Sequence, residues 1–505
     1  MNGWRYGLLG ILLGCWGVLA QASWPGFIGP EMAEAVQESI ESGELPGVVL
    51  QVEQAGETFQ HVAGWRTVVP TAEVMTADTL FDVASLTKVV AATPSVMKLV
   101  EDGRVELDAP LARPHPDGPG GYPVLASRPL PVLTGLDVLR RDGFAILKGR
   151  RVGLITNHTG LARDRTSAID LLQAAPGVSL LALFSPEHGI RGELDRDGIT
   201  DSRDEKSGLP VHSLYGERRA PTAEQLKSID TLVFDIQDIG CRFYTYVSTM
   251  TLAMEAAAKA GKRFIVLDRP NPIGGQKVQG PLREGDFAFI AAHDLPLRHG
   301  LTAGELARLI ASERQWNLDL EVVRCENWRR SQWFDETGLP WINPSPNMRS
   351  LEAAVLYPGI GLLEFTNISV GRGTDTPFLM VGAPWIDADA LAQDLTALAL
   401  PGVRIMPVQF TPNASTYAQT LCHGVRFTVT HREELDSLAL GSALASALCR
   451  GYPAAFDTKN LNKLLLHAES AAAWRAGDPG SQVRAAWYSD ERRFMLRRRP
   501  FLLYN

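Results

Sequence analysis

Four continuous apolar runs in the middle of the chain give the first expectation about its fold. They cover 151–156, 178–184, 231–236 and 263–268. Runs of this length without alternation are typical of strands that are buried on both faces of a sheet. Helical patterns lie between them at 166–174, 222–228 and 248–259. Strands that alternate with helices predict an α/β fold with a doubly wound, mostly parallel sheet.

The pattern changes on both sides of this region. Upstream we expect a helix over 30–43, strands at 48–53 and 58–64, and a helix from Ser85 to Gly103. A Pro/Gly-rich stretch at 113–131 is typical of a linker. Downstream we expect helices at 302–313, 387–398 and 432–449, with Thr302 and Glu305 forming a capping box at the start of the first. This organisation predicts an N-terminal segment, a parallel α/β domain at 132–340 and an α+β domain at 341–505.

Composition narrows the class of protein. The 505 residues are 45% hydrophobic and 21% charged, as in ordinary globular chains. Five Cys are too few for a disulfide scaffold, and their spacing does not match a zinc site. The formal net charge of −8 gives no electrostatic reason to expect a nucleic-acid partner.

The first 22 residues predict export. Arg5 precedes an apolar run from Gly7 to Ala20, and Ala20-Gln21-Ala22 is a small-x-small cleavage site. The run is too short to span a bilayer. Leu12-Leu13-Gly14-Cys15 also resembles a bacterial lipobox. We therefore expect a periplasmic or extracellular protein that contacts a membrane only if Cys15 is lipidated.

The N-terminal segment contains a serine motif. Ser85 and Lys88 are three residues apart, so on a helix they share one face and the lysine can accept the serine proton. Residues 28–112 resemble part of the β-lactamase/penicillin-binding-protein family of serine hydrolases. No Tyr-x-Asn or Ser-x-Asn element follows before the next domain. We interpret 23–112 as a truncated segment, and a serine hydrolase acting through Ser85 and Lys88 stays an alternative.

Polar side chains follow all four apolar runs. Asn157 follows the first run, Glu187 the second, Asp238 the third, and Asp268 ends the fourth. The carboxyl ends of parallel strands meet at one edge of a sheet, where ligands bind. A carboxylic acid and a carboxylate across a cleft are typical of glycoside cleavage. A metal site formed by Glu187, His188, Asp235 and Asp238 is an alternative, and no Gly-x-Gly-x-x-Gly motif indicates a dinucleotide.

Five longer motifs resemble one family. They are Pro186–Gly189, Asp235–Tyr246, Asp268–Pro272, Asn343–Asn347 and Glu364–Thr374. Over about 130–505 the chain resembles the NamZ-type exo-β-N-acetylmuramidases. The resemblance implies a Rossmann-like domain, a C-terminal auxiliary domain and an active site between them. It also implies hydrolysis of non-reducing terminal N-acetylmuramic acid from peptidoglycan fragments in cell-wall turnover. We expect no cofactor and no metal.

The resemblance assigns roles to particular residues. Glu187 is the expected acid, and Asp238, then Asp235, is the expected second carboxylate. Arg242 or Arg372 is expected to bind the lactyl carboxylate of N-acetylmuramic acid, because arginine binds carboxylates with two parallel hydrogen bonds. The expected substrate-binding set is His188, Asn157, Arg242, Tyr244, Tyr246, Asp268, His299, Asn347, Glu364, Asn367 and Arg372. A non-catalytic peptidoglycan-binding protein is the remaining alternative, and the sequence does not decide between retention and inversion.

Overall fold

All four continuous apolar runs form strands of one seven-stranded sheet. They correspond to β4 (Arg151–Thr156), β5 (Ser179–Ser185), β8 (Thr231–Asp235) and β9 (Arg263–Leu267). Three further strands complete the sheet: β6 (Ser202–Arg203), β7 (Pro210–Ser213) and β10 (Leu320–Val323). Every neighbouring pair is parallel except β6 with β7. The expected α/β fold with a mostly parallel sheet is therefore confirmed.

The computed structural model describes residues 36–42, 47–54, 57–67, 73–76, 130–191 and 200–505. The chain divides into two units, Met1–Leu125 and Ala126–Asn505. In the first unit β1 (Gly47–Gln54) pairs antiparallel with β2 (Glu57–Thr67), which pairs with β3 (Glu73–Val74). The two strands expected there are confirmed. Ser85, Lys88, Cys15, the export segment and most of the linker lie outside the described residues.

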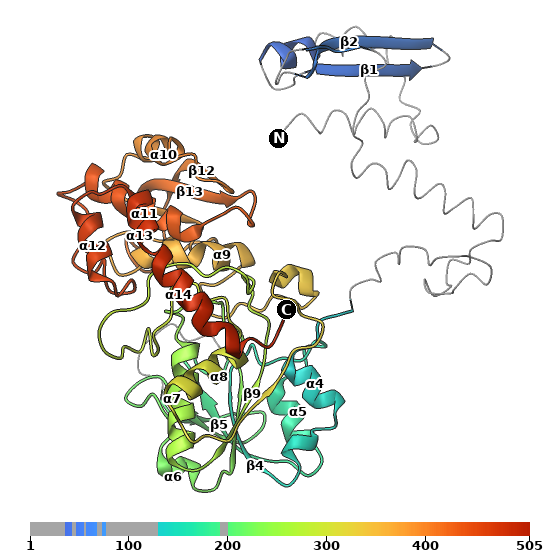
Figure 1. Cartoon of the computed structure of the whole chain (residues 1–505), viewed down its shortest axis with the longest axis vertical. Coiled ribbons are helices and arrows are strands. Elements are labelled where there is room, and N and C mark those ends of the chain that lie inside the picture. Colours follow the sequence, from blue (N-terminus) through green and yellow to red (C-terminus); the bar gives the residue numbers. More distant parts are fainter. Residues whose placement is uncertain (1–35, 43–46, 55–56, 68–72, 77–129, 192–199) are drawn as a thin grey trace. The chain divides into compact units, whose positions relative to one another are not determined.

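Both faces of the large sheet are buried, as its continuous apolar strands require. Val152 and Leu154 of β4 belong to one core with residues of α4 (Gly135–Arg141) and α5 (Ala168–Ala174). Ile155 belongs to a second core with residues of α7 (Tyr246–Lys259) and α8 (Ala303–Glu313). Figure 1 shows α4 and α5 on one side of the sheet and α7 and α8 on the other. The short helix α6 (Ala223–Leu226) precedes β8.

The order of the strands defines a switch point. The sheet runs β10-β9-β8-β4-β5-β7-β6. From β4 the chain adds β5 and β7 on one side, and then crosses over to add β8, β9 and β10 on the other. The reversal lies between β4 and β8. In open parallel sheets, a crevice for ligands forms at this point, beyond the carboxyl ends of the strands.

The C-terminal part combines helices with a small antiparallel sheet. Its strand order is β11 (Met380–Ala383), β13 (Cys422–Val429), β12 (Val403–Phe410). Helix α10 (Ala388–Thr396) packs on this sheet and against α11 (Ser437–Gly451), and α11 also contacts α9 (Leu351–Ile360), α12 (Ala468–Arg475) and α13 (Gly480–Ala486). The expected helices at 302–313, 387–398 and 432–449 are present as α8, α10 and α11. The capping box of Thr302 and Glu305 is confirmed.

The last helix returns to the large sheet. In Figure 1, α14 (Tyr488–Arg498) runs from the C-terminal elements down to α8. Nη1 of Arg498 donates hydrogen bonds to the carbonyls of Gly275 and Gly300 at 3.0 and 2.8 Å. The Tyr504 hydroxyl donates to Asp268 at 2.5 Å. These contacts hold the two parts of the Ala126–Asn505 unit together. Among the described residues, no helix is long and apolar enough to cross a membrane.

Candidate active site

A cavity of about 450 Å³ lies beside Glu187. Its walls come from the turns after β5 and β7, the start of α7, and the C-terminal part. Seven of the predicted site residues line it: Glu187, His188, Tyr244, Tyr246, Asn347, Glu364 and Arg372. The structure therefore brings residues from four of the five sequence motifs to one place.

Glu187 is held in the cavity wall by the start of α7. The Thr245 hydroxyl donates a hydrogen bond to Oε2 of the half-buried Glu187. Thr245 is the N-cap residue of α7. The turn that carries Glu187 continues through His188 at φ 70° and Gly189 at φ 77°. A left-handed non-glycine residue is uncommon, and such backbone is concentrated at functional sites.

Tyrosines form an aromatic wall next to Glu187. The Tyr246 hydroxyl donates to the carbonyl of Pro344 at 2.6 Å. The rings of Tyr244 and Tyr246 are edge to face with centroids 5.0 Å apart, and Tyr357 packs edge-on against Tyr244 at 6.1 Å. All three rings are buried. Packing on several sides fixes their position, so the wall is a rigid surface against which a sugar ring can lie.

Glu364 and Arg372 form an ion pair in the lining of the same cavity. Nη1 of Arg372 contacts Oε1 of Glu364, and both side chains are largely buried. Glu187 and Glu364 are the carboxylates in the lining formed by the described residues. Glu364 has a cationic partner, whereas Glu187 accepts from a neutral hydroxyl.

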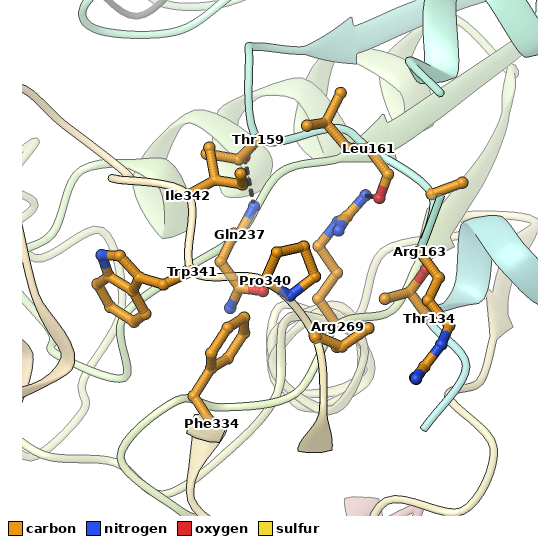
Figure 2. A pocket seen from close by; sticks show the side chains of 12 residues that line it. Thr134, Thr159, Leu161, Arg163, Gln237, Arg269, Phe334, Pro340, Trp341 and Ile342 are labelled. Atoms are coloured by element: carbon orange, nitrogen blue, oxygen red, sulfur yellow. Dashed lines mark hydrogen bonds between the residues drawn. The ribbon is translucent and has the colours of Figure 1, made fainter. Parts of the chain in front are cut away.

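Asp235 lies in a different environment from the one expected. It is completely buried, and Arg269 binds both of its oxygens, with Nε–Oδ1 2.6 Å and Nη2–Oδ2 2.9 Å. Figure 2 shows Arg269 in the lining of a separate cavity, together with Pro340 and Trp341. The volume of this cavity is only about 30 Å³. The charge of Asp235 is already paired and this residue does not line the large cavity, an environment that favours a structural role over a catalytic one.

Asp238 and His299 lie behind the tyrosine wall. Asp238 Oδ2 accepts the Gly240 N–H at 2.7 Å, whereas Oδ1 has no hydrogen-bond partner among the described residues. Leu301 N–H donates to His299 Nδ1 at 3.1 Å, so the neutral ring carries its proton on Nε2, which is 3.8 Å from Asp238 Oδ2. Burial raises the pKa of Asp238 to about 7 and lowers the pKa of His299 to about 3. Neither the expected second carboxylate Asp238 nor the expected substrate ligand His299 lines the large cavity, so the structure does not bring them together with Glu187 there.

Arg242, an expected substrate ligand, does not line the large cavity and has backbone partners instead. Its side chain is completely buried, and its two terminal nitrogens donate to four backbone carbonyls. Two of these carbonyls, Pro281 and Leu295, follow β9, and the other two, Leu464 and Leu465, belong to the C-terminal part. The guanidinium therefore joins the two parts of the unit and has no donor group left on its terminal nitrogens for a substrate carboxylate.

Three further predicted ligands have structural partners outside the large cavity. Asp268 accepts hydrogen bonds from Thr302, Gly304 and Tyr504. Asn157 accepts from the backbone and hydroxyl of Thr159 at 2.9 and 2.6 Å, which shapes the turn after β4. Asn367 bonds to the backbone of residues 455 and 457. None of the three lines the cavity.

Several lining residues escaped the sequence analysis. Thr245 lies inside a quoted motif, but nothing in the sequence showed that its hydroxyl reaches Glu187. Arg219 and Lys463 line the cavity from loops without a recognisable motif. For the metal alternative, the part of the chain that the structure describes contains no cluster of three His, Cys, Asp or Glu side chains.

Comparisons with known proteins agree with this geometry. The family model for the N-terminal part of the exo-β-N-acetylmuramidase NamZ matches residues 152–352, and the model for its C-terminal part matches 355–504. The chain is 43% identical over 378 residues to the peptidoglycan β-N-acetylmuramidase NamZ of Bacillus subtilis, which covers 74% of this chain and 91% of the relative. A β-lactamase family model also matches residues 32–173.

Two solved structures share the fold. Both are DUF1343 family proteins of Bacteroides fragilis. One is 38% identical with a TM-score of 0.70 and covers 74% of this chain and 100% of its own. The other is 31% identical with a TM-score of 0.61 and covers 74% and 99%. With both NamZ models matched in order and a curated relative covered almost completely, the chain belongs to the NamZ family of exo-β-N-acetylmuramidases.

Proposed function

We propose that this protein is an exo-β-N-acetylmuramidase that releases single N-acetylmuramic acid units from the non-reducing ends of peptidoglycan fragments. The observation that carries the proposal is Glu187, which Thr245 holds at the wall of a 450 Å³ cavity. A cavity of this size accommodates one sugar ring with its substituents. The Bacillus subtilis relative is named for this activity.

Glu187 is the general acid in this proposal. Thr245 donates to Oε2, which leaves Oε1 to carry the proton that the leaving glycosidic oxygen receives. The tyrosine wall of Tyr244 and Tyr246 lies beside it and supplies a surface for the sugar ring. The wall also keeps water away from this side of the reacting centre.

The second catalytic role, which the sequence suggested for Asp238 or Asp235, belongs to the substrate itself in this proposal. Among the described lining residues, Glu187 is the carboxylate without an ion pair, since Glu364 is bound to Arg372. One acid is sufficient if the acetamido group of the substrate attacks the anomeric carbon. Asp238 then serves as a positioning residue close to Tyr244 and Tyr246; burial raises the pKa of both hydroxyls, and the nearby Asp238 carboxylate adds to this effect.

The fold is Rossmann-like in this proposal, with an α+β auxiliary domain over 341–505. Counted along the parallel strands, the sheet order is 3-2-1-4-5-6, as in dinucleotide-binding folds. The lining of the large cavity comes from both domains, which supports a site in the cleft between them.

Export to the periplasm or the cell exterior follows from the substrate, because peptidoglycan lies outside the cytoplasmic membrane. The export segment at 1–22 supports this location. Metabolic labelling with a palmitate analogue tests lipidation of Cys15, and a Cys15→Ser variant is the control. Loss of label in the variant indicates a lipid anchor, whereas an unlabelled parent protein indicates cleavage after Ala22.

The experiment that tests the activity uses the full chain with a chromogenic aryl β-N-acetylmuraminide and the matching β-N-acetylglucosaminide. The proposal predicts release from the muraminide, a strong preference over the glucosaminide, and loss of release in Glu187→Gln. Glu217→Gln is the control, because this exposed glutamate does not line the cavity. Equal rates for Glu187→Gln and the parent protein contradict the assignment of the acid.

A second candidate activity rests on the β-lactamase family match over 32–173, which includes Ser85 and Lys88. The match extends through β4, a strand of the seven-stranded sheet, and into helix α5. A fluorescent penicillin tests this activity directly: covalent labelling lost in Ser85→Ala supports it, and an unlabelled parent protein contradicts it.

A further inference from the structure

Arg219 is a cation held on an aromatic surface at the edge of the large cavity. Its guanidinium carbon lies 4.1 Å from the centroid of the Phe289 ring and 5.9 Å from that of Tyr215. The two rings pack against each other with centroids 5.9 Å apart. All three residues line the same cavity as Glu187. Stacking engages the face of a guanidinium and leaves its N–H edge free to donate.

The topology of the sheet places Arg219 on the loop next to that of Glu187. β5 and β7 are parallel neighbours, with Ser185 paired to Ser213. Glu187 lies two residues beyond the first serine, and Tyr215 lies two residues beyond the second. The loop that continues from Tyr215 to Arg219 therefore leaves the sheet beside the turn that carries the proposed acid.

The other arginines considered for a substrate carboxylate are already occupied. Arg372 is paired with Glu364, and Arg242 is consumed by backbone carbonyls. Arg219 contacts aromatic rings, and among the described residues it has no carboxylate within ion-pair distance. Lys463 also lines the cavity, with Nζ 3.7 Å from the centroid of the Phe365 ring, but it comes from the C-terminal part and has no planar fork.

We propose that Arg219 is the specificity-determining residue of the site and binds the lactyl carboxylate of N-acetylmuramic acid through its N–H edge. The inference rests on the proposed function. N-acetylmuramic acid differs from N-acetylglucosamine by this lactyl ether, so a cation in the same cavity as the acid distinguishes the two sugars by charge. The aromatic pair of Tyr215 and Phe289 keeps the guanidinium in place before substrate arrives, which reduces the entropy lost on binding.

The test measures discrimination between a carboxylate and its neutral counterpart. The substrates are an aryl β-N-acetylmuraminide and the same compound with the lactyl carboxylate converted to a carboxamide. For Arg219→Gln we expect kcat/KM on the carboxylate substrate to fall on the order of 10–100-fold, the size of a lost charge-assisted hydrogen bond, mainly through KM. On the carboxamide the variant and the parent protein are expected to be alike.

Two matched variants separate this role from a structural one. Arg218→Gln removes the neighbouring charge, which lies near Asp201 and does not line the cavity, and is expected to leave discrimination unchanged. Lys463→Gln is likewise expected to retain it. The proposal would be overturned if Arg219→Gln lost kcat/KM equally on both substrates or lost none on either. It would also be overturned if discrimination disappeared in Lys463→Gln instead.

A binding measurement keeps this result independent of catalysis. Titration calorimetry compares free N-acetylmuramic acid with N-acetylglucosamine on the parent protein and on Arg219→Gln. Preferential binding of N-acetylmuramic acid that disappears in the variant supports the inference, even in a protein that hydrolyses neither aryl glycoside. An inactive parent protein would contradict the proposed function, whereas an unchanged preference in Arg219→Gln would contradict the role of Arg219.

Discussion

The contacts of Arg242 predict that it stabilises the fold without contacting substrate. Replacing it by Met removes donors from four buried carbonyls, three of them at 2.9 to 3.1 Å. A buried acceptor without a partner costs about 1–3 kcal/mol. Replacement by Met also removes a buried cation that has no carboxylate partner, and this offsets part of the cost of the four unpaired carbonyls. The cost of burying this charge is also the reason why the pKa of Arg242 is lowered to about 10. We expect a net destabilisation of about 3–5 kcal/mol.

Urea unfolding of the full chain followed by tryptophan fluorescence measures this loss, and steady-state kinetics on the aryl muraminide at low temperature measures KM. Arg492→Met, on the exposed face of α14, is the control and is expected to change stability by less than about 0.5 kcal/mol. A variant of Arg242 that unfolds at the same urea concentration as the parent protein but has a much higher KM would refute the structural assignment.

Three further predictions concern the groups around the acid. Thr245→Val is expected to lower kcat on the aryl muraminide about 10-fold with little change in KM, since one hydrogen bond to Glu187 is lost; an unchanged kcat would contradict the positioning role. Asp235→Asn is expected to destabilise the protein by about 3–5 kcal/mol in urea unfolding, because Arg269 stays buried without its counterion; a fully stable variant would contradict this. Burial raises the pKa of Asp238 to about 7, so the folded state favours the protonated form of this side chain. The contribution of Asp238 to the stability of the fold is therefore full below pH 4 and is lost as the pH rises to 7. Between pH 5 and 8, the free energy of unfolding of the parent protein is therefore expected to fall by on the order of 2 kcal/mol more than that of Asp238→Asn, as measured by urea unfolding. Parallel pH profiles of the two proteins would contradict the raised pKa.

The sequence predicted the strands well wherever burial was continuous. β4, β5, β8 and β9 have both faces covered, so each is a run of apolar residues that can be recognised without a partner. β7 and β10 are short and only partly buried, and their residues alternate in burial or are all half-exposed. Their pairing depends on strands far away in the chain, which a local pattern does not contain.

For the site, the sequence predicted the sheet edge but not which part of it is open. Polar residues do follow the strands, yet next to Arg269 the segment with Pro340 and Trp341 packs close enough that the cavity they line together has a volume of only about 30 Å³. Asp235 is buried beneath this region, whereas Glu187, after β5, faces the large cavity. The covering segment lies about one hundred residues downstream of Asp235. Its position results from tertiary packing and has no signal near the carboxylates.

The sequence also did not predict the hydrogen-bond and ion-pair partners of the arginine side chains. Arg242 and Arg372 both occur in family motifs, and only the fold shows that one is enclosed by carbonyls and the other is paired with Glu364. Arg219 occurs in no motif. Its place beside Glu187 follows from the parallel pairing of β5 with β7, a strand that the sequence did not reveal.

The most direct test of the central claim is the product pattern from natural peptidoglycan strands. Strands that begin with N-acetylmuramic acid at the non-reducing end are incubated with the full chain, and the released sugars are identified by mass spectrometry over time. The account predicts free N-acetylmuramic acid as the first product and none with Glu187→Gln. Disaccharides or longer fragments as first products, or unchanged release by Glu187→Gln, would contradict it.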